Sequence, residues 1–182
     1  MYSVLPLRAS AVRDSSTDGR VRELVRNHLD AVVRTLAQLG VADSVLDDAA
    51  QQVFVIATNK LPGIELGRER PYLLGIALRV ASHARRTVQR RREIPIDDQL
   101  AMAEPRPLPD QLLDERRAYA LLESIVAQLP DGTREAFVLF ELEQLAASEV
   151  AEVLAIPIGT VASRVRRARE LVRESLLRAR QP

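Results

Sequence analysis

The sequence predicts an all-α protein made of two small helical domains joined by a Pro-rich linker. The chain has 182 residues and is 47% hydrophobic, with only 3% aromatic residues and seven glycines. Apolar residues recur at helical spacing along most of the chain, and no long alternating pattern typical of strands is present. Four of the ten prolines fall in one central stretch, which divides the helical segments into two groups.

Composition also limits the compartment and the chemistry. The chain has no cysteine, so it forms no disulfide and uses no thiolate. No apolar run is long enough for a membrane span, and the first 20 residues lack the apolar core of a signal peptide. We therefore expect a soluble, cytoplasmic protein.

Two helices are predicted near the amino terminus, after a segment (1–19) that has no clear period and is expected to be mobile. The first helix, 20–39, should end at Gly40, as at a C′ glycine. The second helix extends to about residue 59, with Asp43 or Ser44 as its side-chain cap. Its apolar stripe leaves a polar face that includes Asp48, Gln51 and Gln52.

A loop over 61–69 follows, because this segment contains one proline and two glycines. A third helix is predicted over 70–92. It carries a second stripe, beside its apolar one, at spacings of four, three and four residues: Arg79, His83, Arg86 and Arg90.

The linker is predicted at 94–109, where prolines and acidic residues leave no apolar stripe. The second domain then covers 110–182. It should begin with a helix that ends before Pro130, and Asp131 or Thr133 should cap the next helix.

The segment 148–169 has the outline of a helix-turn-helix. A short apolar helix precedes Pro157, whose fixed φ suits the first turn of a new helix. The new helix buries one stripe, formed by Val161, Val165, Ala168 and Val172. Another face carries residues suited to a DNA major groove, namely Thr160, Ser163, Arg164 and Arg167, with Arg166 beside them. A solvated basic face is the alternative.

The net charge is only +1, but the basic residues are clustered. The segments 79–92 and 157–182 hold 13 of the 26 basic residues. Between them, 93–123 holds eight acids and three arginines. Two basic blocks separated by an acidic connector predict two points of contact with a polyanion.

No catalytic, cofactor or metal site is predicted. Asp47 and Asp48 are adjacent and so point to different sides of a helix. His28 and His83 have no second ligand at metal spacing, and no phosphate-binding loop or nucleophile motif is present. The protein is therefore not expected to be an enzyme.

Three segments resemble one known family. The stretch LPDGTREAFVLFELEQLAASEVAEVLAIPIGTVASRVRRARELV (129–172) is similar to the promoter-reading domain of bacterial RNA polymerase sigma factors, most of all the extracytoplasmic-function (ECF) type. DDAAQQVF (47–54) resembles the family's D-x-x-Q-x-x-F helix, and YLLGIALRVASHARR (72–86) resembles its minus-10 helix. The segments occur in the family's order, two before the predicted linker and one after it.

The resemblance implies a function for each face. Asp48, Gln51 and Gln52 would dock on core RNA polymerase. The domain 20–93 would also bind the minus-10 promoter element, through Tyr72, Arg79, Arg86 and Arg90. The domain 110–182 would read the minus-35 element, through Thr160, Ser163, Arg164, Arg166 and Arg167. The family also suggests an anti-sigma protein as inhibitor.

The chain departs from the family pattern at several positions, including Gln144 and Ala155, where glycine is usual. Two other functions stay open. A stand-alone helix-turn-helix regulator would bind DNA without polymerase, and an all-α adaptor would use its basic patches to bind acidic proteins.

Overall fold

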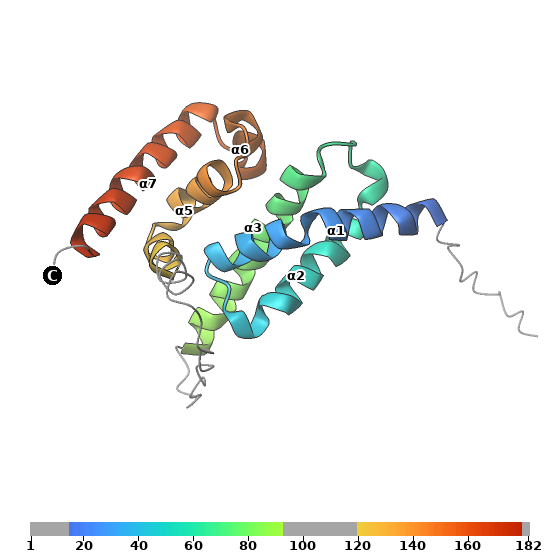
Figure 1. The fold of residues 1–182 in the computed structure, drawn as a ribbon, viewed down its shortest axis with the longest axis horizontal. Coiled ribbons are helices and arrows are strands. Elements are labelled where there is room, and N and C mark those ends of the chain that lie inside the picture. The colour runs from blue at the N-terminus through green and yellow to red at the C-terminus, as the bar shows by residue number, and fades with distance from the viewer. Residues whose placement is uncertain (1–14, 93–119, 180–182) are drawn as a thin grey trace, which may run out of the picture.

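The computed structural model describes residues 15–92 and 120–179, and every regular element in these ranges is helical (Figure 1). The predicted all-α class is confirmed. Segment 1–14 and the predicted linker lie outside the described residues.

The amino-terminal half consists of three helices that pack on one another: α1 (Ser15–Gln38), α2 (Asp43–Thr58) and α3 (Glu69–Arg92). Helix α1 begins within the segment that was expected to be mobile. It ends at Gln38, and Gly40 follows in the turn with a φ of +84°, a conformation that suits glycine. The short turn η1 (Leu61–Gly63) lies in the predicted loop.

The predicted cap of α2 is wrong. Helix α2 starts at Asp43 itself, and its N-cap is Ala42, which has no side chain to cap it. The Asp43 carboxylate instead lies in the first turn, where the helix dipole favours negative charge.

The carboxy-terminal half starts with a helical segment, 120–127. Four further elements follow: α5 (Asp131–Phe137), the π-helical turn η2 (Val138–Leu142), α6 (Ala147–Leu154) and α7 (Ile158–Ala179). Pro130 is the N-cap of α5, so the predicted side-chain cap by Asp131 or Thr133 is also wrong. Helix α7 starts directly after Pro157, as predicted.

Two turns of this half use left-handed backbone at residues other than glycine. Gln144, between η2 and α6, has φ of 55°, and Ala155, at the end of α6, has φ of 51°. These are the two positions named above as departures from the family's usual glycine. The turns keep the glycine-type conformation although the side chains make it costly.

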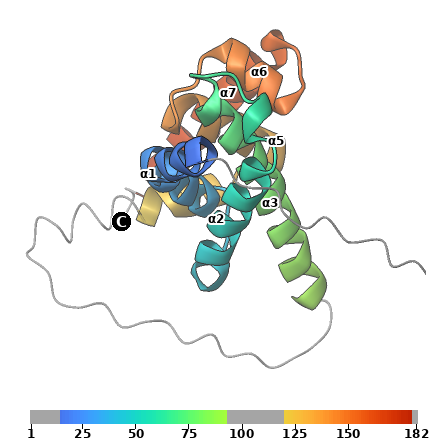
Figure 2. The ribbon, with the colours of Figure 1, turned by 90° about the vertical axis from the view of Figure 1, so that its right-hand side faces the viewer.

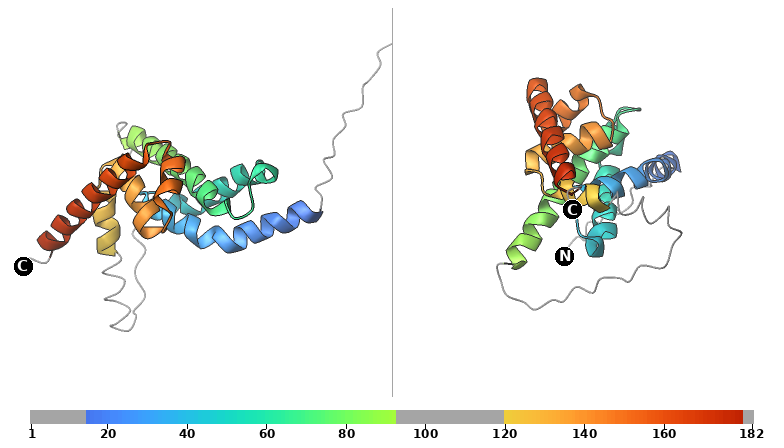
Figure 3. Two further views of the ribbon diagram at one scale, coloured as in Figure 1. Left: turned by 90° about the horizontal axis from the view of Figure 1, so that it is seen from above. Right: turned by 60° about the vertical axis from the view of Figure 1, so that its left-hand side comes forward.

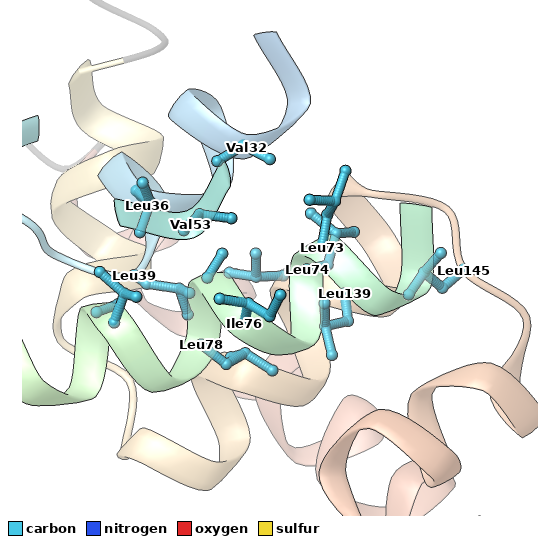
Figure 4. Packing of buried hydrophobic residues seen from close by; sticks show 14 of the residues in the cluster. Val32, Leu36, Leu39, Val53, Leu73, Leu74, Ile76, Leu78, Leu139 and Leu145 are labelled. Atoms are coloured by element: carbon cyan, nitrogen blue, oxygen red, sulfur yellow. The ribbon is translucent and has the colours of Figure 1, made fainter. Parts of the chain in front are cut away.

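The two halves pack against each other around one hydrophobic core (Figure 2). Helix α3 packs on α6, and α1 contacts η2. In the core, Val32 and Val53 of the amino-terminal half lie with Leu73 and Leu74 of α3, close to Leu139 of η2 (Figure 4). The amino-terminal end of α1 extends away from α7 (Figure 3). This closed arrangement did not follow from the sequence.

Candidate nucleic-acid interface

Helix α7 presents a polar face because its apolar stripe is buried. Val161, Val165 and Ala168 are at most 5% exposed, and they hold the helix against α5 and α6. On the other side, Ser163 is exposed, and its Oγ donates a hydrogen bond to the Thr160 carbonyl oxygen at 2.9 Å. Thr160 itself is half-buried.

The arginines of α7 differ in their exposure and in the partners that their side chains bind. Arg166 is exposed, and the side chain of Arg167 is 60% exposed and forms an ion pair with Glu170 at 3.4 Å. The Nε of Arg169 donates to Oε1 of Glu141 at 2.7 Å. Exposed pairs of this kind contribute little to stability, so Arg167 can exchange its partner for a phosphate or a base edge at low cost.

Arg164 is turned back onto the protein. It is half-buried, and its Nη1 donates to the Gly132 carbonyl oxygen at 3.4 Å. A Cβ on Gly132 would lie only 2.9 Å from this Nη1, so the glycine makes room for the guanidinium at the start of α5. In this conformation Arg164 braces α7 on α5, whereas Arg166 and Arg167 point to solvent.

The second arginine face lies on α3. Arg79, His83 and Arg86 are exposed, and the Nε of Arg86 donates to the Ser82 carbonyl oxygen at 3.2 Å. Of Arg90, the structure describes only the backbone, in the last turns of α3.

A pocket of about 400 Å³ lies at the start of α3. Tyr72 and Arg79 line it together with the loop before α3, so the structure brings these two predicted residues together. Arg86 lies two helical turns beyond Arg79 and is not part of the lining. The opposite wall comes from α6, through Glu152 and Val153.

On α2, Asp48, Gln51 and Gln52 are exposed, as predicted. Gln51 lines an apolar groove of about 550 Å³ between α1 and α2, which the sequence did not reveal, whereas Asp48 and Gln52 are not part of the lining. Two large apolar residues of its lining are unusually exposed, Leu29 at 40% and Val55 at 56%. Val55 lies outside the buried stripe of α2, and the residues three and four positions away on either side are polar, which is the signal that could have indicated the groove: Gln51, Gln52, Thr58 and Asn59.

Arg134 joins α5 to the preceding helical segment from inside the protein. Its Nε donates to the Val126 carbonyl oxygen at 3.1 Å, and its Nη2 donates to those of Ala127 at 2.6 Å and Leu129 at 2.8 Å. It thus caps the carboxy-terminal end of the 120–127 helix. Burial lowers the pKa of Arg134, and the nearby Arg85 lowers it further.

The described residues contain no group of three or more acidic or histidine side chains placed to hold a metal ion. Within the same ranges, no helix has the length and apolar character needed to cross a bilayer.

Comparison with known proteins places this arrangement among related chains. A family model described as "Sigma-70, region 4" matches residues 119–172. The chain is 31% identical over 156 residues to ECF RNA polymerase sigma factor SigE of Mycolicibacterium smegmatis. This match covers 85% of this chain and 60% of that protein. It is 32% identical over 167 residues to ECF RNA polymerase sigma factor SigC of Mycobacterium tuberculosis. This match covers 89% of this chain and 86% of that protein.

Two solved structures share the fold. CnrH, in complex with the cytosolic domain of CnrY, superposes with a TM-score of 0.67 at 24% identity, over 90% of this chain and 91% of that chain. Sigma factor RpoE of Bartonella quintana, in complex with the anti-sigma factor NepR, superposes with a TM-score of 0.65 at 23% identity. The second match covers 86% of this chain and 96% of that chain.

Proposed function

Because this chain belongs to the ECF group of sigma-70 family sigma factors, we propose that it binds core RNA polymerase and directs the enzyme to promoters with two sequence elements. The observation that carries the proposal is the helix-turn-helix of α6 and α7, with its apolar stripe buried and Ser163, Arg166 and Arg167 exposed. In this proposal 110–182 reads the minus-35 element, 20–93 binds the minus-10 element and polymerase, and 94–109 links them.

The polymerase-docking surface consists of the groove between α1 and α2 and the polar residues beside it. Leu29 and Val55 supply apolar area that water contacts in the free protein. Asp48, Gln51 and Gln52 supply exposed polar groups along one side. An apolar centre with a polar rim is typical of a specific protein interface.

The minus-10 element would bind at the pocket of α3. A base turned out of an opened duplex costs a few kcal/mol, which stacking and hydrogen bonds must offset. Tyr72 offers the aromatic surface there, and Arg79 offers a cation. Arg86 and Arg90, further along α3, would neutralise backbone phosphates. In the helix-turn-helix, Thr160 and Arg164 would support the contacts of Ser163, Arg166 and Arg167.

An inhibitory protein is the further partner in this proposal. The RpoE match is a complex with an anti-sigma factor, and its fold is shared with this chain. The exposed apolar groove between α1 and α2 is a surface that such a protein could cover.

Selection from a pool of random DNA duplexes tests the proposal. The protein is incubated with the pool alone and together with core polymerase, and the bound DNA is sequenced. We expect two conserved blocks at a fixed spacing, enriched only when polymerase is present. Equal enrichment without polymerase would indicate a stand-alone regulator, and no enrichment in either sample would indicate an adaptor for acidic proteins.

Two variants separate the contact types in the same experiment. Arg167→Ala should relax one base preference in the upstream block, at a cost of about 1–3 kcal/mol. Arg86→Ala should instead weaken binding to all sequences and reduce the slope of log affinity against log salt by about one.

A further inference from the structure

A large apolar side chain lies exposed at the amino-terminal end of α7. Ile158, the first residue of the helix, is 56% exposed, whereas Val161 and Val165 of the buried stripe are at most 5% exposed. The packing of α7 on α5 and α6 therefore does not account for Ile158. Single exposed apolar residues are common on protein surfaces, so the meaning of Ile158 depends on which residues surround it.

The surroundings of Ile158 are the face that α7 presents to solvent. Residues four positions apart lie above one another on a helix, so two neighbouring rows follow this face. Every member of both rows is exposed: Ile158, Ala162 and Arg166 in the first row, and Gly159, Ser163 and Arg167 in the second. A Cβ on Gly159 would meet no atom within 4 Å, which shows how open this end of the face is.

The charge on this face is confined to its third turn, at Arg166 and Arg167. The first two turns carry no charged side chain of either row. Their hydroxyl group, on Ser163, already donates its hydrogen to the Thr160 carbonyl oxygen at 2.9 Å. The end of the face that holds Ile158 is thus mainly apolar, and the guanidinium groups lie one turn behind it.

The chemistry of base edges gives this apolar end a specific partner. The amino-terminal residues of a recognition helix are those that contact base edges in the major groove. There the bases present hydrogen-bonding groups, and thymine alone adds an apolar C5-methyl group. An apolar surface leaves hydrogen-bonding groups without partners, which costs free energy, whereas burial of a methyl group against it is favourable.

We propose that Ile158 and Ala162 select thymine in the minus-35 element by packing against its C5-methyl group, while Arg166 and Arg167 bind guanine or phosphate one turn away. This inference rests on the proposed reading of that element by α7. Ile158 then determines sequence preference although it is neither basic nor polar. Loss of the thymine methyl group should weaken binding about fourfold, as expected for one buried group of this size.

Selection from two pools of random duplexes tests the proposal. One pool contains thymidine and the other contains deoxyuridine in its place, which keeps every hydrogen-bonding group and removes only the methyl group. The full-length protein with core polymerase selects from each pool, and the bound DNA is sequenced. We expect a conserved thymine in the upstream block of the first pool and no preference at that position in the second. An upstream block without a conserved thymine, or an equal preference in both pools, would overturn the proposal.

Two variants then assign the methyl contact to Ile158. Ile158→Ser removes the apolar surface, and Leu177→Ser is the matched control, because Leu177 is 57% exposed at the other end of the same helix. Both sites are exposed, so the fold should tolerate both changes. The probe is a fluorescein-labelled duplex of the selected sequence, with the conserved thymine or with deoxyuridine at that one position.

Wild type and Leu177→Ser, each with core polymerase, should prefer the thymine duplex about fourfold, and Ile158→Ser should bind the two duplexes equally. A preference that persists in Ile158→Ser would mean that the methyl group acts through DNA shape, and would refute the contact. Failure of the proposed function looks different. In that case neither pool yields an upstream block that depends on polymerase, which would overturn both proposals, whereas failure of the methyl contact alone leaves this block in place.

Discussion

Gln144 and Ala155 adopt a backbone conformation that glycine adopts at no steric cost. With φ near 50°, each L-residue brings its Cβ close to the following carbonyl oxygen, which costs about 1–2 kcal/mol. A glycine at either position would avoid this steric cost, but its larger conformational entropy in the unfolded chain would offset part of the stabilisation. The glycine positions of the family thus correspond to real conformational demands in this chain.

Ala155→Gly should therefore stabilise the protein by about 0.5–1 kcal/mol. Urea unfolding followed by circular dichroism measures this change. The control is Ala162→Gly, the same substitution at an exposed position inside α7, which should destabilise by about 1 kcal/mol. Destabilisation by both changes would mean that the turn at Ala155 carries no strain.

His28 should make stability depend on pH. Burial lowers the pKa of His28 below 6.5, Glu69 opposes this shift and Arg70 adds to it. Because the folded state favours the neutral imidazole, its contribution is complete above the unfolded pKa and is lost as the pH falls through the folded pKa. The free energy of unfolding of wild type should thus drop, relative to His28→Gln, when the pH falls below about 6.5. Parallel pH profiles for the two proteins would contradict this.

At the level of elements, the groove between α1 and α2 adds an apolar surface to the predicted polar face of α2. Val55→Asp places a charge in the groove at a side chain that is 56% exposed, so the fold should tolerate it. We expect the affinity for core polymerase to fall at least about tenfold.

Val45→Asp is the matched control, because Val45 is also an exposed valine of α2 but does not line the groove. Biolayer interferometry with immobilised core polymerase compares the two variants. An equal loss of affinity in both would place the docking surface elsewhere on α2.

Much of the element order could be predicted from local sequence, and the failures have physical reasons. The apolar stripes of α3 and α7 could be predicted because they depend on residues within two helical turns. The same holds for the end of α1 before Gly40 and the start of α7 after Pro157. The caps were missed because α2 and α5 start at Asp43 and Asp131 themselves and use these carboxylates in the first turn. Helix-start rules place such residues at the cap by default.

The site was predictable only in part. Exposure of Arg86, Arg166 and Arg167 followed from the helical period. The turn of Arg164 onto Gly132 did not follow, because it joins residues 32 positions apart. The burial of Glu143 did not follow either, since its partner Arg34 is 109 positions away and no local pattern records such a contact.

At the level of the whole molecule, two arginine faces lie on two halves that share one core. Reading two promoter elements at once requires these faces to reach separate stretches of DNA, whereas the closed arrangement holds α6 against α3. The proposed function thus requires an interface that is strong enough to define the free protein and weak enough for polymerase and DNA to open. Its ion pairs, Arg34 with the buried Glu143 and Arg68 with the exposed Glu152, fit such a balance.

Mapping of transcript 5′ ends tests this function as a whole. Core polymerase transcribes sheared genomic DNA from the source bacterium with and without the protein, and the ends are sequenced. We predict that the protein creates a small set of discrete start sites, each preceded by the same two sequence blocks at one spacing. Start sites that are the same in number and position with and without the protein would contradict its assignment as the promoter-selecting subunit.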